Sequence, residues 1–208
     1  MAIFSTAYLP PIEYFVHLAK EKSVSVELQE NYHKQSYRNR CNIYGANGML
    51  PLIIPVESNQ ANHVNIKDVK ISYKENWQVN HWRAIESAYN SSPFFLYYKD
   101  DILPFYSKYF KFLFDFNNKL LDLFINIIEI NTSISATEIF LSEYENDLDF
   151  RYEISPKNLK FKNSSTMEIP HYTQVFESKH GFIPNLSIID LLFNEGPESL
   201  SYLEGVKL

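Results

Sequence analysis

Residues 2–28, with the sequence AIFSTAYLPPIEYFVHLAKEKSVSVEL, contain the pattern that decides the fold. Residues 2–7 are mostly apolar and predict a buried strand, which two prolines terminate. Apolar side chains at helical spacing predict a helix over residues 12–22, and alternating polar and apolar side chains predict a second strand over residues 23–28. A strand, a helix and a strand in this order predict a βαβ unit with two parallel strands.

The next segment, ENYHKQSYRNRCNI at residues 30–43, is rich in cations and amides. No acidic residue occurs between Glu30 and Glu57, although the formal net charge of the chain is −6. Ligands of parallel sheets bind at the carboxyl ends of the strands, where this segment and Tyr8 are expected. Arginine and lysine bind phosphate and carboxylate groups through charge-assisted hydrogen bonds, so the sequence predicts an anion site here.

Residues 37–56 predict a β-hairpin, because Asn47-Gly48 is typical of a type I′ turn. Side chains alternate along a strand. We therefore expect Asn39 on the face that points to the core, and Arg38 and Arg40 on the opposite face.

Helical patterns dominate the second half of the chain. Residues 76–89 predict a helix whose apolar stripe includes His81. A longer helical region is expected over residues 103–130, with a break near residues 117–118. A short apolar helix is expected to begin after Ser187.

Two other segments have weaker patterns. Residues 69–71 predict a short strand, and residues 136–144 fit either a short helix or a short strand. The predicted fold class is α/β: an N-terminal Rossmann-like βαβ sheet with an added β-hairpin over residues 1–75, followed by a mostly helical C-terminal half over residues 76–208. We expect the two portions to form a single domain.

Composition and charge exclude several classes of protein. With 45% hydrophobic and 21% charged residues, the 208-residue chain has an ordinary globular composition. The acidic balance argues against a general nucleic-acid binder. The most apolar stretch, residues 120–130, is too short and too polar to span a bilayer, which requires about 20 apolar residues. The N-terminus lacks a signal-peptide pattern, so we expect a cytoplasmic protein without a transmembrane segment.

No motif indicates a cofactor or a metal. Cys41 is the single cysteine, which excludes an intrachain disulfide and a cysteine-based zinc knuckle. His171 and His180 are nine residues apart, with no convincing carboxylate at ligand spacing. The sequence contains neither a Walker A motif nor a Rossmann glycine fingerprint. We therefore expect no cofactor and no metal site.

Several different short motifs are distributed along most of the chain. They are Tyr8-Leu9-Pro10 with Glu13-Tyr14-Phe15, Lys34 with Ser36 and Asn39-Arg40, Leu52 to Val56, Asn76-Trp77 with His81, Ile85 and Tyr89, Pro93-Phe94-Phe95, His171-Tyr172 with Gln174, and Ile183 to Asn194. Together they resemble the WbqC-like family, which is found among bacterial proteins of surface-polysaccharide gene clusters. The resemblance implies a role in assembling O-antigen or related glycans.

The sequence departs from this family in two places. The opening His-Gln-Pro of the family falls on Phe4-Ser5-Thr6, so any role of that histidine is absent or taken over. The family's glycine-bearing segment is not recognisable in residues 147–167.

His81 and His33 are the candidate catalytic residues. His81 lies on an apolar helix stripe, where a histidine is either a hydrogen-bonded core residue or a proton acceptor. His33 lies in a predicted loop, where it is either solvent-exposed or a general base, since the ordinary histidine pKa is about 6.5.

The candidate ligand-binding residues are Tyr8, Lys34, Arg38, Asn39 and Arg40. Arg38 and Arg40 either bind an anion or line a solvated strand face. Asn39 interrupts the apolar face of its strand, so its amide either organises the backbone or contacts a ligand.

Two hypotheses follow. The first is a transferase that acts on a nucleotide-activated or amino-modified sugar. In it, Lys34, Arg38 and Arg40 neutralise an anionic small molecule, either a nucleotide sugar or an acyl donor. Asn39 and Tyr8 orient it. The alternative is a non-catalytic binding or assembly protein of a polysaccharide or envelope pathway. Convergence of the candidate residues on one pocket favours the enzyme, whereas an exposed apolar patch favours the binding protein.

Overall fold

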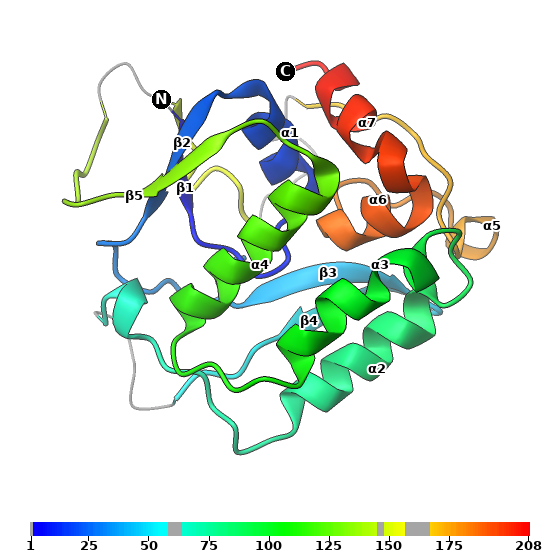
Figure 1. The fold of residues 1–208 in the computed structure, drawn as a ribbon, viewed down its shortest axis with the longest axis horizontal. Helices are drawn as coiled ribbons and strands as arrows, with labels where there is room; N and C mark the ends of the chain where they lie inside the picture. Colours follow the sequence, from blue (N-terminus) through cyan, green and yellow to red (C-terminus); the bar gives the residue numbers. More distant parts are fainter. Residues whose placement is uncertain (1, 58–63, 145–147, 157–166) are drawn as a thin grey trace.

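The protein contains a parallel four-stranded sheet, and Figure 1 shows three of its strands, β1, β2 and β5, beside α1 and α4. The computed structural model describes residues 2–57, 64–144, 148–156 and 167–208. The strand order is β5–β2–β1–β6 and every neighbouring pair is parallel. The strands are β1 (Ala2–Ser5), β2 (Ser23–Glu27), β5 (Ser133–Ala136) and β6 (Leu148–Asp149). The predicted βαβ unit is confirmed, with Ala2 paired to Val24.

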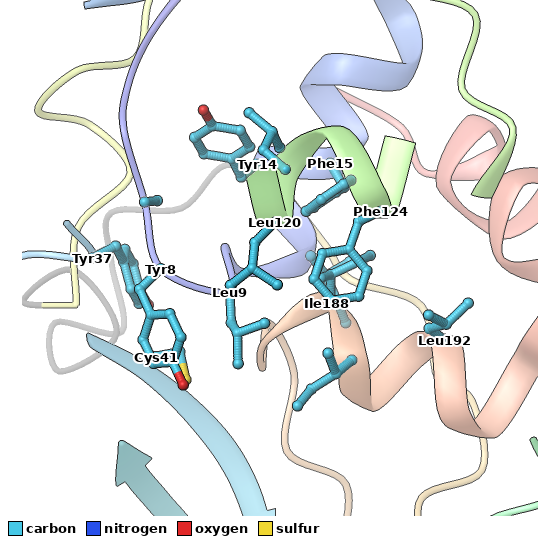
Figure 2. Close-up of a cluster of buried hydrophobic side chains, with 14 of the residues drawn as sticks. Tyr8, Leu9, Tyr14, Phe15, Tyr37, Cys41, Leu120, Phe124, Ile188 and Leu192 are labelled. Atoms are coloured by element: carbon cyan, nitrogen blue, oxygen red, sulfur yellow. The ribbon is translucent and has the colours of Figure 1, made fainter. Parts of the chain in front are cut away.

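Helix α1 (Ile12–Lys20) connects β1 to β2 and buries an apolar face. Phe15 of α1 meets Phe124 of α4 (Leu113–Ile128) edge-on, with ring centroids 6.4 Å apart. Figure 2 shows these two rings packed with side chains of α6 (Ile188–Glu195) beside the loop that contains Leu9. Burial of such large apolar side chains contributes most of the free energy that holds these elements together.

The predicted hairpin is confirmed as β3 (Arg40–Gly45) and β4 (Gly48–Ile53), a separate antiparallel sheet. Residues 36–39, however, are not part of the strand, and all four are buried. The backbone of this segment is held by the Tyr8 N–H, which donates to the Tyr37 carbonyl at 2.8 Å. The predicted solvent-facing position of Arg38 is therefore wrong, because strand alternation begins only at Arg40.

Helix α2 (Trp77–Tyr89) is confirmed, and His81 lies on its buried stripe. The prediction of one long helical region over residues 103–130 is wrong. The structure has α3 (Phe95–Ile102), a 3₁₀ turn η2 (Leu103–Tyr106), an extended stretch and then α4. The chain is extended just before α4, where residues 111–113 bond to residues 69–71. The Ile71 N–H donates to the Lys111 carbonyl, and the Leu113 N–H donates to the Val69 carbonyl.

Helix α4 runs unbroken through residues 117–118, where a break was expected. The side-chain amide of Asn117 is buried and donates to the Arg38 carbonyl at 2.8 Å. Strand β5 ends at Ala136, and residues 137–144 form neither a helix nor a strand. Most of the segment that lacks the family's glycine pattern lies outside the described residues.

The C-terminal part contains α5 (Glu177–His180), α6, a 3₁₀ turn η4 (Gly196–Glu198) and α7 (Ser199–Gly205), which packs on α1. The second half of the chain is mostly helical, as predicted, but it also supplies β5 and β6 to the N-terminal sheet. No helix of the described residues is long and apolar enough to cross a membrane.

Candidate functional site

Arg38 forms a buried ion pair with Glu30. Its Nε donates to Oε1 of Glu30 at 2.7 Å, and its Nη2 donates to Oε2 of the same carboxylate. Burial raises the pKa of the Glu30 carboxyl, and the hydrogen bonds from Arg38 oppose that rise. The guanidinium of Arg38 is thus neutralised inside the protein and is not offered to an anion in solvent.

A second buried arginine, Arg151, lies at the same carboxyl edge of the sheet. It donates to Glu27 at 3.0 Å and to Asp149 at 2.6 Å, and its carbonyl accepts a hydrogen bond from Arg38 at 3.3 Å. Five charged residues therefore form one network where β1, β2 and β6 end. Sequence reasoning missed three residues of this network: Asp149 and Arg151 lie in a polar segment without a periodic pattern, and Glu27 was assigned only to the predicted strand.

His33 and Lys34 lie on the exposed side of this network. The His33 ring is edge-on to Tyr152, with centroids 5.3 Å apart. Partial burial and the nearby Arg38 charge lower the pKa of His33, which leaves the imidazole neutral and able to accept a proton at pH 7. Lys34 forms no ion pair with any described residue.

Arg40 and Asn39 contain buried polar atoms without a partner. The Nε of Arg40 and the Oδ1 of Asn39 are shielded from solvent, and neither makes a hydrogen bond within the described residues. The Asn39 Nδ2 donates to the Ile54 carbonyl at 2.9 Å, which fixes the amide. Burial raises the pKa of the Tyr32 hydroxyl, and the Arg40 charge opposes that rise. Among the described residues, Arg40 is thus a second cation of this segment, besides Lys34, without an ion pair.

Tyr8 and His81 converge beneath the hairpin. The Tyr8 hydroxyl lies 2.9 Å from Nδ1 of His81 and 2.8 Å from the hydroxyl of Tyr106. Burial lowers the pKa of His81 to about 4, so the ring is neutral at pH 7. The residue after Tyr8, Leu9, has a φ of 41°, a left-handed conformation that is strained for a leucine.

A third polar centre surrounds Asp190 of α6. Its carboxylate is buried and accepts hydrogen bonds from Tyr89 at 2.8 Å, Tyr172 at 2.5 Å and Gln174 at 2.8 Å. Burial raises the pKa of Asp190, and these three donors oppose the rise. Sequence analysis predicted only that a helix begins near this aspartate, whereas in the structure its carboxylate joins α2, α6 and the loop before α5.

Comparison with known proteins identifies the family. The profile of the WbqC-like protein family matches residues 6–157 and 143–202. The chain belongs to this family. A similar relative is Uncharacterized protein Rv1507c of Mycobacterium tuberculosis, 25% identical over 224 aligned positions, which cover 98% of this chain and 96% of the relative. No solved structure gave a significant match. The WbqC-like resemblance inferred from the motifs is confirmed.

The WbqC-like chain brings some of the predicted site residues together and separates others. Tyr8 and His81 are in hydrogen-bond contact. Arg38 points inward to Glu30, whereas Lys34 is exposed. Within the part of the chain that the structure describes, no group of three or more metal-ligating side chains is placed to hold an ion.

Proposed function

We propose that this WbqC-like chain is a transferase of surface-glycan biosynthesis. It binds the anionic part of a nucleotide-activated or amino-modified sugar, or of an acyl donor, over residues 30–40. The observation that carries the proposal is the buried Nε–H of Arg40, for which no described residue provides an acceptor. A buried donor without an acceptor costs free energy, which a phosphate or carboxylate oxygen of a ligand recovers.

Three further features support this location. Residues 30–40 follow β2 and lie at the carboxyl edge of a parallel sheet, where α/β proteins bind their ligands. The exposed ammonium of Lys34 is in the same segment. The strained backbone at Leu9 lies beside Tyr8, and strain of this kind concentrates at functional sites.

The proposed roles follow from these surroundings. Arg40 and Lys34 bind the charged group of the donor, and the free Oδ1 of Asn39 accepts a hydrogen bond from one of its hydroxyls. His33 is the proton acceptor, because its lowered pKa keeps it neutral at pH 7. His81 is a positioning residue, because its buried ring holds the hydroxyl of Tyr8.

A thermal-shift screen against nucleotide sugars and acyl-coenzyme A compounds tests the proposal. A ligand present at about 100 times its Kd stabilises the folded state by about 2.7 kcal/mol, which raises the Tm of a chain this size by about 5–10 °C. We expect Arg40→Met to abolish that shift. The matched control is Arg83→Met, which removes an exposed arginine of α2.

Each outcome decides the proposal. A shift with one donor class that disappears in Arg40→Met and persists in Arg83→Met supports the donor site and names the substrate class. Equal shifts in both variants place the ligand elsewhere. If no donor produces a shift, the donor-site proposal is rejected.

One observation favours the alternative, a non-catalytic assembly protein. Strand β4 is an edge strand, and Met49, Leu50 and Ile53 on it are exposed. Exposed apolar groups on an unpaired edge are typical of binding surfaces. Rejection of the donor site would make this hairpin the next region to test.

A further inference from the structure

A basic pocket lies at the N-terminal end of α4, in the stretch that interrupts the expected long helix. Its volume is about 600 Å³. Three of its lining residues are Lys108, Lys111 and Lys119, against a single acidic one, Asp115. None of the three lysines forms an ion pair with a described residue. An excess of unpaired cations in a chain of net charge −6 indicates a site for an anion.

The pocket is built on a fixed loop. The Tyr73 hydroxyl donates to the Phe110 carbonyl at 3.0 Å and accepts from the Phe110 N–H at 2.9 Å. Gln78 of α2 donates to the Lys108 carbonyl at 2.7 Å. The Lys119 ammonium lies 5.6 Å from the centre of the Phe110 ring, which also lines the pocket. The backbones that carry the lysines are therefore positioned before a ligand arrives, which lowers the entropic cost of binding.

Two other lining residues specify more than charge. The Oδ1 atom of Asn118 is buried and has no hydrogen-bond partner among the described residues, so it can accept a hydrogen bond from a hydroxyl. Tyr109 is 71% exposed, and its ring packs against Tyr73 with centroids 4.7 Å apart and the ring planes tilted by 33°. An exposed, fixed aromatic face packs well on the C–H face of a sugar ring.

We propose that this pocket binds a phosphorylated sugar. The lysines bind the phosphate, Asn118 accepts a hydrogen bond from a sugar hydroxyl, and Tyr109 packs on the ring. The phosphate belongs either to a free sugar phosphate or to a nucleotide sugar, since both present the same groups.

The pocket is separate from the donor site proposed over residues 30–40. Asn117 points to the buried Arg38 carbonyl, and Asn118 is the next residue of the helix. Successive residues of an α-helix are turned by about 100°, so Asn118 and the pocket lie on another side of α4. This inference does not depend on the proposed function.

Isothermal titration calorimetry with glucose 1-phosphate tests the site on the full chain. We expect binding that weakens when NaCl is raised from about 50 to 200 mM. Lys108→Met with Lys119→Met should weaken binding about tenfold or more, because two charge-assisted contacts are lost. Lys22→Met with Lys207→Met changes the net charge equally at exposed positions far along the chain and should leave the Kd unchanged.

Additional variants separate the possible sites and ligands. Asn118→Ala should weaken the binding of glucose 1-phosphate but not the binding of inorganic phosphate. UDP-glucose binding equal to that of glucose 1-phosphate supports recognition of the sugar phosphate alone, and tighter UDP-glucose binding that is lost in the Lys108/Lys119 variant supports a nucleotide sugar as the source.

Three results would overturn the proposal. They are no heat at millimolar glucose 1-phosphate, equal Kd values for the wild type and the Lys108/Lys119 variant, and loss of binding in Arg40→Met with retention in the lysine variant. The last result would move the ligand to residues 30–40 and support the donor site instead.

Discussion

Arg38 and Glu30 form a bidentate ion pair in the interior, with the Arg38 Nε 2.7 Å from Oε1 of Glu30. The pair fixes the cationic segment to the carboxyl edge of the sheet, because Glu30 follows β2 and Arg38 precedes β3. It also leaves Arg40, rather than Arg38, as the arginine without a partner in that segment.

Removal of one partner from this pair should strongly destabilise the fold. Arg38→Met leaves the Glu30 carboxylate buried and uncompensated, and we expect a loss of about 3–5 kcal/mol in the free energy of unfolding. Urea denaturation measures this loss. The double variant Glu30→Gln with Arg38→Met should recover part of it, since no charge then remains unpaired. A loss no larger than that of Arg83→Met, at an exposed site, would show that the pair contributes little.

His81 should make the protein less stable in acid. Its pKa is about 4 in the folded state and about 6.5 when unfolded, so the unfolded chain binds the proton first as the pH falls. The stabilisation is fully present above pH 6.5 and is lost between pH 6.5 and 4, by about 3 kcal/mol. Unfolding of wild type and His81→Gln at several pH values should show the two converging toward acid. The same substitution at the exposed His180 provides the comparison.

Asp190 should give the opposite pH dependence of stability from His81. Burial raises its pKa above the usual 3.8, so the folded state holds the proton more tightly than the unfolded chain does. Stability from this group is present at low pH and is lost as the pH rises above about 3.8. We expect the stability difference between wild type and Asp190→Asn to shrink with rising pH, as measured by urea denaturation. Asp100→Asn, at an exposed site of α3, provides the comparison, and a parallel pH dependence of all three proteins would contradict the prediction.

Gly196 is required by a close contact as well as by its backbone. Its φ is 55°, and a Cβ at this position would lie 2.5 Å from the ring of Phe94. Gly196→Ala should therefore cost about 1–3 kcal/mol through overpacking and strain. Thermal unfolding beside Gly205→Ala, whose added methyl group meets no atom within 4 Å, tests this. Equal Tm values for the two variants would show that the ring moves aside without cost.

Local patterns predicted the elements whose stability depends on near neighbours in the sequence. The apolar run before Tyr8 and the alternation at residues 23–28 predicted two parallel strands, which the structure has. Asn47-Gly48 predicted the hairpin correctly but the type I′ turn wrongly: the two-residue loop is Ala46-Asn47, neither has positive φ, and the positive φ of 98° falls on Gly48, the first residue of β4. The helical spacing around His81 likewise predicted the buried face of α2.

Patterns failed where a distant partner overrides the local preference. Strand alternation placed Arg38 toward solvent, but Glu30 draws it into the interior. Helical periodicity continued through residues 107–112, but residues 111–113 bond to the segment around Ile71 and the chain is extended just before α4. Likewise, β6 is too short and polar to predict, and it forms because it pairs with β1.

The sequence by itself determined the βαβ start, the hairpin, the helical stripe and the family, because each depends on residues a few positions apart or on motifs in fixed order. Only the tertiary structure decided which charged groups are neutralised and which remain available. A single cation segment became a buried pair at Arg38, an unpartnered donor at Arg40 and an exposed charge at Lys34. The physical reason is that desolvation and ion pairing depend on distances in space, which residues far apart in the sequence set together.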